Sequence, residues 1–212
     1  MKALPRLFVL ADSISIGYGP ELERLLDGRF TYDRKGYALL ATAPLDSPQI
    51  NGGDSACVLA YLRSAVSELP RASLLLLNCG LHDLRVNPLS RAHQVELPEY
   101  TRNLEQILYL AADAGHHLVW VRTTPVADAL HNRLSAEYWR YTADIERYNA
   151  AADHVMLVNE APTIDLYRFT LRLAQPPGGL EALYEDHVHF TTDVRRLQAA
   201  YIAGWLEAYI HG

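Results

Sequence analysis

Short apolar segments alternate with amphipathic segments along the whole chain. Apolar runs too short to form helices predict buried strands. These runs are Leu7–Ala11, Phe30–Asp33, Leu74–Asn78, Leu118–Thr123 and Thr163–Leu166. Between them, hydrophobic residues recur every three or four positions, which predicts helices. The expected helices are Pro20–Asp27, Asp54–Leu69, a helix from Leu97 that Gly115 closes, Ser135–Asn159, and a last helix through Leu197 and Trp205.

This alternation predicts an α/β fold, because parallel strands need long crossover connections and helices supply them. We expect a three-layer α/β/α architecture with a flavodoxin-like parallel sheet of about five strands and helices on both faces. No repeat, low-complexity tract or linker interrupts the pattern, so one domain over residues 1–212 is expected. Irregular stretches at 36–53, 124–134 and 174–185 are candidates for a functional rim or for plain surface loops.

Composition narrows the class of protein. The net charge of -6 argues against a broad surface for nucleic acid or anionic membranes, since both need excess Lys and Arg. Cys57 and Cys79 have no partner at metal-ligand spacing and are expected to be buried thiols. No signal peptide is visible, and no apolar run approaches the ~20 residues of a membrane span. A soluble, cytoplasmic protein without membrane insertion is therefore expected, with secretion left open and the oligomeric state undetermined.

Polar motifs follow the predicted strands or lie in neighbouring loops. In an open α/β sheet, ligands bind outside the carboxyl ends of the strands, so these motifs are candidates for the site of chemistry. The four motifs are Ala11-Asp12-Ser13, Asn51-Gly52-Gly53-Asp54-Ser55, Asn78-Cys79-Gly80-Leu81-His82-Asp83 and Asp186-His187-Val188-His189-Phe190.

Together the motifs supply the groups that acyl transfer requires. A serine hydroxyl such as Ser13 needs a base to take its proton, and neutral His189 is suited to that task. Asp186 lies three residues before His189, a spacing that lets a carboxylate orient the imidazole within one short loop. The backbone N–H groups of Ser13 and Gly53 are natural donors to an oxyanion, with Gly52 as the neighbouring alternative.

The four motifs, in this order, resemble the blocks of the SGNH hydrolases, also called the GDSL esterase/lipase family. The resemblance runs from Ser13 to His189 and covers most of the chain. It implies a catalytic triad of Ser13, Asp186 and His189, and an oxyanion hole formed by Ser13, Gly53 and His82. It implies neither a metal nor an organic cofactor.

Two positions depart from the family pattern. Ala11 stands where the first block has glycine, which we expect the fold to tolerate if φ is negative there. His82 replaces the asparagine whose amide would be the third oxyanion donor. An imidazole N–H can fill that role, but the loss of one such donor typically costs about 10²–10³ in rate.

Other polar residues near the motifs are expected to have structural roles. Asp12 and Asp83 should tie loops by hydrogen bonds, and His187 should be structural because it points away if the Asp-x-x-His block is read correctly. Arg85 could meet an anionic group of a substrate, although a solvated arginine is the commoner case.

The resemblance implies a serine esterase that acts on small-molecule or carbohydrate esters. We expect short acyl groups, such as O-acetyl esters of carbohydrates, with lysophospholipase or thioesterase activity as alternatives within the family. Two other classes remain open. A metal-dependent phosphoesterase would use ligands from Asp12, His82, Asp83, Asp186, His187 and His189. A non-catalytic carbohydrate-binding relative would explain the departures at positions 11 and 82.

Overall fold

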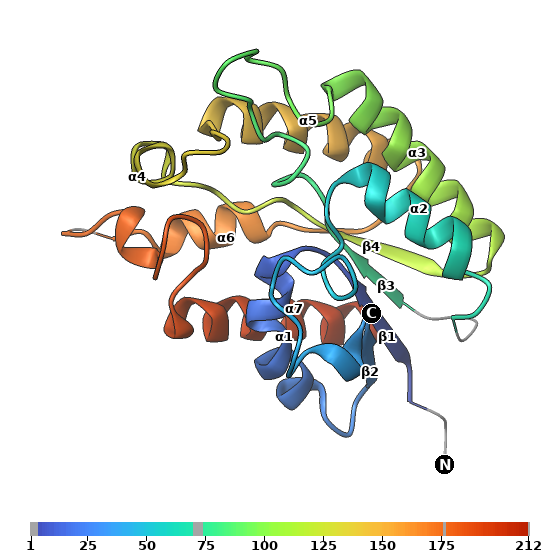
Figure 1. Ribbon diagram of the computed structural model, residues 1–212. Coiled ribbons are helices and arrows are strands. Elements are labelled where there is room, and N and C mark those ends of the chain that lie inside the picture. Colours follow the sequence, from blue (N-terminus) through green and yellow to red (C-terminus); the bar gives the residue numbers. More distant parts are fainter. Residues whose placement is uncertain (1–3, 70–73, 176, 212) are drawn as a thin grey trace.

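The computed structural model describes residues 4–69, 74–175 and 177–211, and it is built on a five-stranded parallel sheet (Figure 1). The strand order is β2-β1-β3-β4-β5, and every neighbouring pair is parallel. The strands are β1 (Arg6–Leu10), β2 (Thr31–Arg34), β3 (Leu74–Leu77), β4 (His117–Val121) and β5 (Thr163–Ile164). The chain reverses its winding direction between β1 and β3, the position where doubly wound sheets bind ligands.

Helices cover both faces of the sheet, which confirms the three-layer prediction. On one side, α1 (Ser13–Leu26) and α6 (Leu166–Leu173) pack against α7 (Thr192–His211). On the other side, α3 (Leu97–Asp113) packs against both α2 (Ser55–Ala65) and α5 (Thr142–Val158) (Figure 1). A short helix, α4 (Asp128–Leu134), and two 3₁₀ turns, η1 (Tyr37–Leu39) and η2 (Glu181–Leu183), lie in the connections.

Helix α1 begins earlier than the predicted Pro20. The Asp12 side chain accepts a hydrogen bond from the backbone N–H of Ile14 at 3.0 Å, and this cap starts the helix at Ser13. Pro20 therefore lies inside α1. The cap therefore outweighs the low helix propensity of the nearby glycines and proline, which had predicted a loop before Pro20.

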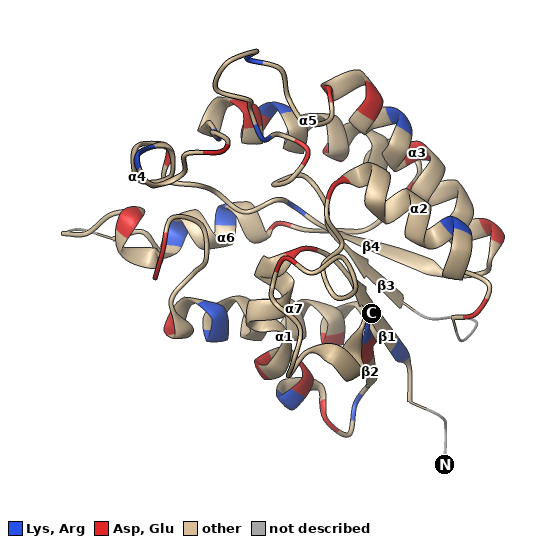
Figure 2. Ribbon diagram, viewed as in Figure 1, with Lys and Arg blue, Asp and Glu red and all other residues tan. Residues whose placement is uncertain are grey.

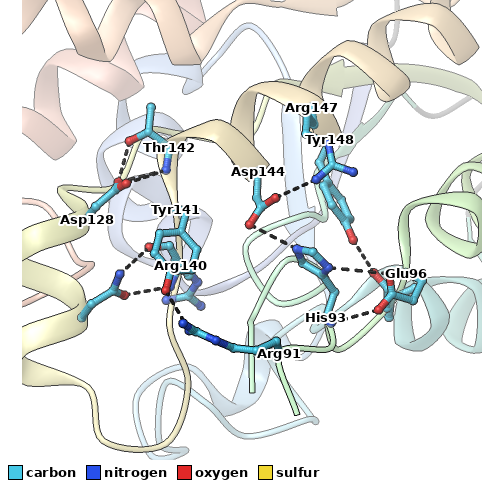
Figure 3. A network of polar contacts seen from close by, with 12 residues as sticks. Arg91, His93, Glu96, Asp128, Arg140, Tyr141, Thr142, Asp144, Arg147 and Tyr148 are labelled. Atoms are coloured by element: carbon cyan, nitrogen blue, oxygen red, sulfur yellow. Dashed lines mark hydrogen bonds and ion pairs between the residues drawn. The ribbon is translucent and has the colours of Figure 1, made fainter. Parts of the chain in front are cut away.

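The predicted helix Ser135–Asn159 is wrong in its first part, because α4 ends at Leu134 and α5 starts only at Thr142. The Asp128 carboxylate accepts hydrogen bonds from the backbone N–H of Thr142 at 2.9 Å and from its hydroxyl at 2.5 Å, which fixes the start of α5 (Figure 3). The segment between the helices has no helical turn, and Trp139 in it forms an antiparallel bridge with Val86. Tyrosine periodicity alone could not reveal this long-range pairing.

The sequence pattern did not predict α6. The predicted strand Thr163–Leu166 is too long, because it includes the first residue of this helix. Strand β5 has only two residues, and the Asp165 side chain then accepts a hydrogen bond from the backbone N–H of Arg168 at 3.0 Å. This cap opens α6 at Leu166.

The core is one cluster of buried side chains around the sheet. All four leucines of β3 are buried, as expected for a strand covered by helices on both faces. Tyr100 and Tyr148 are fully buried, and the Tyr100 hydroxyl donates to the Cys79 carbonyl oxygen at 3.2 Å. The core therefore supports the loop that follows β3, where the third polar motif lies.

Figure 2 shows acidic and basic residues interspersed along the helices. None of the described helices is long and apolar enough to cross a membrane.

Candidate active site

Ser13 stands where β1 passes directly into α1. It is the first residue of the helix and is 8% exposed. The first N–H groups of an α-helix have no acceptor within the helix, and the described residues supply none for Ser13 N–H. Ala11 has a negative φ, so the backbone accommodates alanine at this position, as expected.

Ser13, His189 and Asp186 come together in one continuous hydrogen-bonded chain. Ser13 Oγ lies 3.0 Å from His189 Nε2, and His189 Nδ1 lies 2.6 Å from Asp186 Oδ2. Because Nδ1 faces a carboxylate, it carries the ring proton, and Nε2 is left as the acceptor for the Ser13 hydroxyl. The imidazole is therefore placed to take a proton from Ser13.

The loop that carries His189 is organised by Asp186 itself. Asp186 Oδ1 accepts hydrogen bonds from the backbone N–H groups of Val188 at 2.6 Å and His189 at 2.7 Å. Partial burial raises the pKa of Asp186, but the hydrogen bonds from His189 and Val188 outweigh it and leave the pKa below its ordinary value. The carboxylate stays ionised and can stabilise a protonated imidazole.

The second motif is tied to the end of β1, next to Ser13. Gly52 N–H donates to the Ala11 carbonyl oxygen at 2.9 Å, and a Cβ at Gly52 would lie 3.0 Å from that oxygen. Gly53 adopts a φ of +73°, which favours glycine. Its N–H donates to Asn51 Oδ1 at 2.8 Å, so this candidate oxyanion donor is engaged within its own loop.

His82 lies in the loop after β3, two residues beyond Gly80, where this loop comes close to the loop after β4. Gly80 has a φ of +147°, and a Cβ there would lie only 2.3 Å from Thr123 Oγ1. Burial, followed by the nearby charges of Arg85 and Arg140, lowers the pKa of His82 to about 3. His82 is therefore neutral near pH 7 and offers one N–H as a donor.

The two aspartates expected to be structural tie loops by hydrogen bonds. Asp12 caps α1, and Asp83 Oδ1 accepts from the backbone N–H of Ser55 at 2.9 Å. Burial raises the pKa of Asp83 to about 7, against the lowering effect of the hydrogen bonds from Ser55.

A pocket of about 300 Å³ opens beside these loops, and we call it the side pocket. Its walls include Lys35, Gly53, Asp54, His82, Arg85 and Tyr138. Arg85 is half-buried rather than solvated, and its guanidinium carbon lies 4.2 Å from the centre of the Tyr138 ring. The sequence missed Tyr138 as a pocket residue because it was assigned to a helix.

His187 contacts a residue that sequence reasoning did not single out. His187 Nδ1 lies 2.8 Å from Nδ1 of His131, which is fully buried on α4. Burial, then the charges of Arg140 and His187, lowers the pKa of His131 to about 4, so one neutral ring donates to the other. The pair joins α4 to the loop of His189. Nothing in the local sequence around His131 signals this contact.

The described residues contain no group of three or more His, Cys, Asp or Glu side chains placed to hold a metal ion. The carboxylates of Asp12, Asp83 and Asp186 instead accept hydrogen bonds from nearby backbone N–H groups.

The fold is shared with solved lipases and esterases. No protein-family model and no curated protein matches the sequence. A lipase/acylhydrolase from Enterococcus faecalis aligns with a TM-score of 0.71 and 17% identity, over 97% of each chain. A GDSL-like lipase from Bacteroides thetaiotaomicron has a TM-score of 0.66 and 15% identity, over 98% of this chain and 93% of that one. An acetylxylan esterase from Geobacillus stearothermophilus has a TM-score of 0.66 and 14% identity, over 95% and 94%.

This likeness shows that the chain has the three-layer fold of these enzymes. Identity of this degree carries the fold alone, since one fold hosts many activities. The chemistry has to be argued from the side chains of the site.

Proposed function

We propose that the protein is a serine esterase of the SGNH/GDSL type that hydrolyses carboxylic esters through an acyl-enzyme. The observation that carries the proposal is the chain of contacts from Ser13 Oγ through His189 to Asp186, at 3.0 and 2.6 Å. These three residues come from two distant parts of the sequence and meet at the switch point of the sheet. This order of contacts supports the roles of nucleophile for Ser13, base for His189 and orienting carboxylate for Asp186.

In the proposed reaction, Ser13 Oγ attacks the ester carbonyl carbon while His189 Nε2 takes the hydroxyl proton. The carbonyl oxygen becomes an oxyanion, and the free N–H of Ser13 and the ring N–H of His82 donate to it. The tetrahedral intermediate collapses, the alcohol leaves with the proton from His189, and the acyl group stays on Ser13. Water then attacks the acyl-enzyme with His189 as base and releases the acid.

The third donor, Gly53 N–H, already donates to Asn51 Oδ1. It can stabilise the oxyanion only through a hydrogen bond shared between the two acceptors. Asn51 also donates from Nδ2 to the Leu45 carbonyl oxygen at 2.9 Å, so its side chain is held in place. Gly53 is therefore a weaker donor in this arrangement than Ser13, whose N–H has no competing acceptor among the described residues.

We further propose short acyl groups, with O-acetyl esters of carbohydrates as the first class to examine. The modest size and mixed polar lining of the side pocket fit a small polar ester better than a long alkyl chain. The acetylxylan esterase among the structural neighbours supports the same choice. Rates with para-nitrophenyl esters of two to sixteen carbons test it, and a preference for the long chains would favour the lysophospholipase or thioesterase alternative.

The Ser13→Ala variant tests the enzyme class. Loss of the nucleophile should abolish acyl-enzyme formation, so hydrolysis of para-nitrophenyl acetate should fall by about 10⁴-fold or more. A fluorophosphonate should label Ser13 in the unmodified protein and leave the variant unlabelled, as shown by peptide mapping. Unchanged activity in the variant would remove Ser13 from the mechanism.

A further inference from the structure

Three basic side chains lie in or beside the side pocket without an acidic partner. Lys35 is 9% exposed and donates from Nζ to the Asn51 carbonyl oxygen at 2.7 Å. Arg140 is 2% exposed and donates from Nε to the Leu81 carbonyl oxygen at 2.7 Å. Arg85 lies on the pocket wall. None of the ion pairs among the described residues involves any of the three.

Two of these cations have donors with nothing to bind. Arg85 Nε and Arg140 Nη1 are buried and have no hydrogen-bond acceptor among the described residues. An unsatisfied buried donor is costly, and more so on a charged group. Among these cations Arg85 also lines the side pocket, so its guanidinium brings a positive charge with an unused donor to the place where a ligand would bind.

The carboxylates near the pocket do not neutralise this charge by direct contact. Asp54 uses Oδ1 to accept from Cys57 N–H at 2.9 Å and Oδ2 to accept from Gln94 Nε2 at 2.6 Å. Asp12 caps α1. Asp46 and Glu137 also line the pocket, but both are exposed, so solvent screens their charges. The low pKa of His82, owed first to burial and then to Arg85 and Arg140, agrees with a positive potential beside the nucleophile.

The surrounding structure holds Arg85 in place without the help of an acidic group. Its neighbour Val86 forms antiparallel bridges with His93 and Trp139. His93 lies between Glu96 and Asp144, with Nε2 3.2 Å from an Asp144 oxygen, and this network fastens the segment to α5 (Figure 3). The Tyr138 ring then lies against the Arg85 guanidinium. A cation fixed in this way binds an anion with little loss of side-chain freedom.

We propose that the side pocket binds an anionic group of the ester substrate, a carboxylate or a phosphate, with Arg85 as its main partner. Lys35, which also lines the pocket, adds a second positive charge. Arg140, whose guanidinium carbon lies 4.9 Å from the centre of the Tyr138 ring, adds to the positive potential. The proposal deepens the esterase function and rests on it, because it names the substrate class of the same site. The preferred substrates are then esters of acidic molecules.

Matched ester pairs test the proposal by turnover. One pair carries the charge on the alcohol, as para-acetoxybenzoate and its methyl ester, with para-acetoxyphenyl phosphate as the phosphate arm. The other pair carries it on the acyl group, as monophenyl adipate and methyl phenyl adipate. The measured quantity is the ratio of kcat/KM for the anionic ester to kcat/KM for its neutral partner.

In Arg85→Met this ratio should fall by about 10- to 100-fold for at least one pair, the effect of losing a charge-assisted hydrogen bond. Arg85→Lys should retain part of the ratio, which separates charge from folding. Arg91→Met is the matched control, since Arg91 lies over Trp139 at 4.8 Å in the same segment and does not line the side pocket. An unchanged ratio in Arg85→Met, or an equal loss in Arg91→Met, would overturn the proposal.

A binding measurement keeps this test separate from the esterase function. The Ser13→Ala variant is titrated by calorimetry with para-hydroxybenzoate, with phenyl phosphate, and with the methyl ester of para-hydroxybenzoate. If the Ser13→Ala variant binds an anion and the added change Arg85→Met abolishes that binding, the pocket is supported. This holds even if the natural protein turns over no ester, a result that would count against the esterase function alone. Equal affinity for the anions and the neutral ester would refute the pocket whatever the activity.

Discussion

The role of Asp186 gives the sharpest test of the proposed mechanism, through the variant Asp186→Asn. The carboxylate makes three hydrogen bonds, of which two reach the backbone N–H groups of Val188 and His189 through Oδ1. An asparagine oxygen can keep these two bonds and preserve the loop. The amide nitrogen then takes the place of Oδ2, 2.6 Å from His189 Nδ1.

That exchange reverses the hydrogen bond at Nδ1. An amide N–H can only donate, so Nδ1 must become the acceptor and the ring proton moves to Nε2. Nε2 then cannot take the proton of Ser13, although every atom stays near its place. A tautomer change of this kind lowers kcat by about 10⁴-fold in a serine triad. The effect on stability should be small, under about 1 kcal/mol, because Asp186 is 42% exposed and loses one solvent-screened contact.

The assay measures kcat with para-nitrophenyl acetate and the free energy of unfolding in urea. Asp193→Asn is the control, because it makes the same chemical change on an exposed carboxylate whose one ion pair among the described residues is with Arg196 at 3.4 Å. The control should keep both activity and stability. If Asp186→Asn retained more than about a tenth of the activity, the orienting role assigned from the tautomer argument would be refuted.

Two further predictions concern the loops that carry the candidate oxyanion donors Gly53 and His82. Gly53→Ala forces alanine into a φ of +73° with its Cβ 3.1 Å from the Cys57 Cβ, whereas Gly28→Ala meets a similar φ of +71° with no atom within 4 Å. Both should lower the free energy of unfolding by about 1–2 kcal/mol in urea titrations, Gly53→Ala by more, and only Gly53→Ala should also reduce kcat/KM. For His82, the folded-state pKa of about 3 lies below the ordinary 6.5, so the unfolded chain alone takes up a proton between these values and stability falls as the pH drops through that window. His82→Asn should therefore lose less free energy of unfolding than the natural protein between pH 7 and pH 4, and identical losses would contradict the buried, neutral ring.

Much of the site could be predicted from the sequence because its signals are local. Asp186 and His189 lie within one turn, and their backbone can bring the two side chains together without help from the rest of the fold. Ser13 follows an apolar strand directly, so its place at the sheet edge follows from chain order. The contacts of His189 with Ser13 and Asp186 agree with the geometry expected of the predicted triad.

The side pocket could not be predicted in the same way. Arg85 and Tyr138 meet only because Val86 and Trp139 pair across the fold, and no periodicity records such a contact. The hydrogen bond that occupies Gly53 N–H likewise depends on how the Asn51 side chain turns inside its loop.

The sequence by itself determined the strand and helix alternation, the parallel sheet, and the positions of the polar motifs after strands or in neighbouring loops. These features follow from burial patterns and caps that act over a few residues, where neighbours in the chain are also neighbours in space. The tertiary structure alone decided which basic side chains lie at the side pocket without an acidic partner among the described residues, and which backbone N–H groups already have an acceptor. Those properties depend on contacts between distant segments, whose geometry is set by the packing of the whole core.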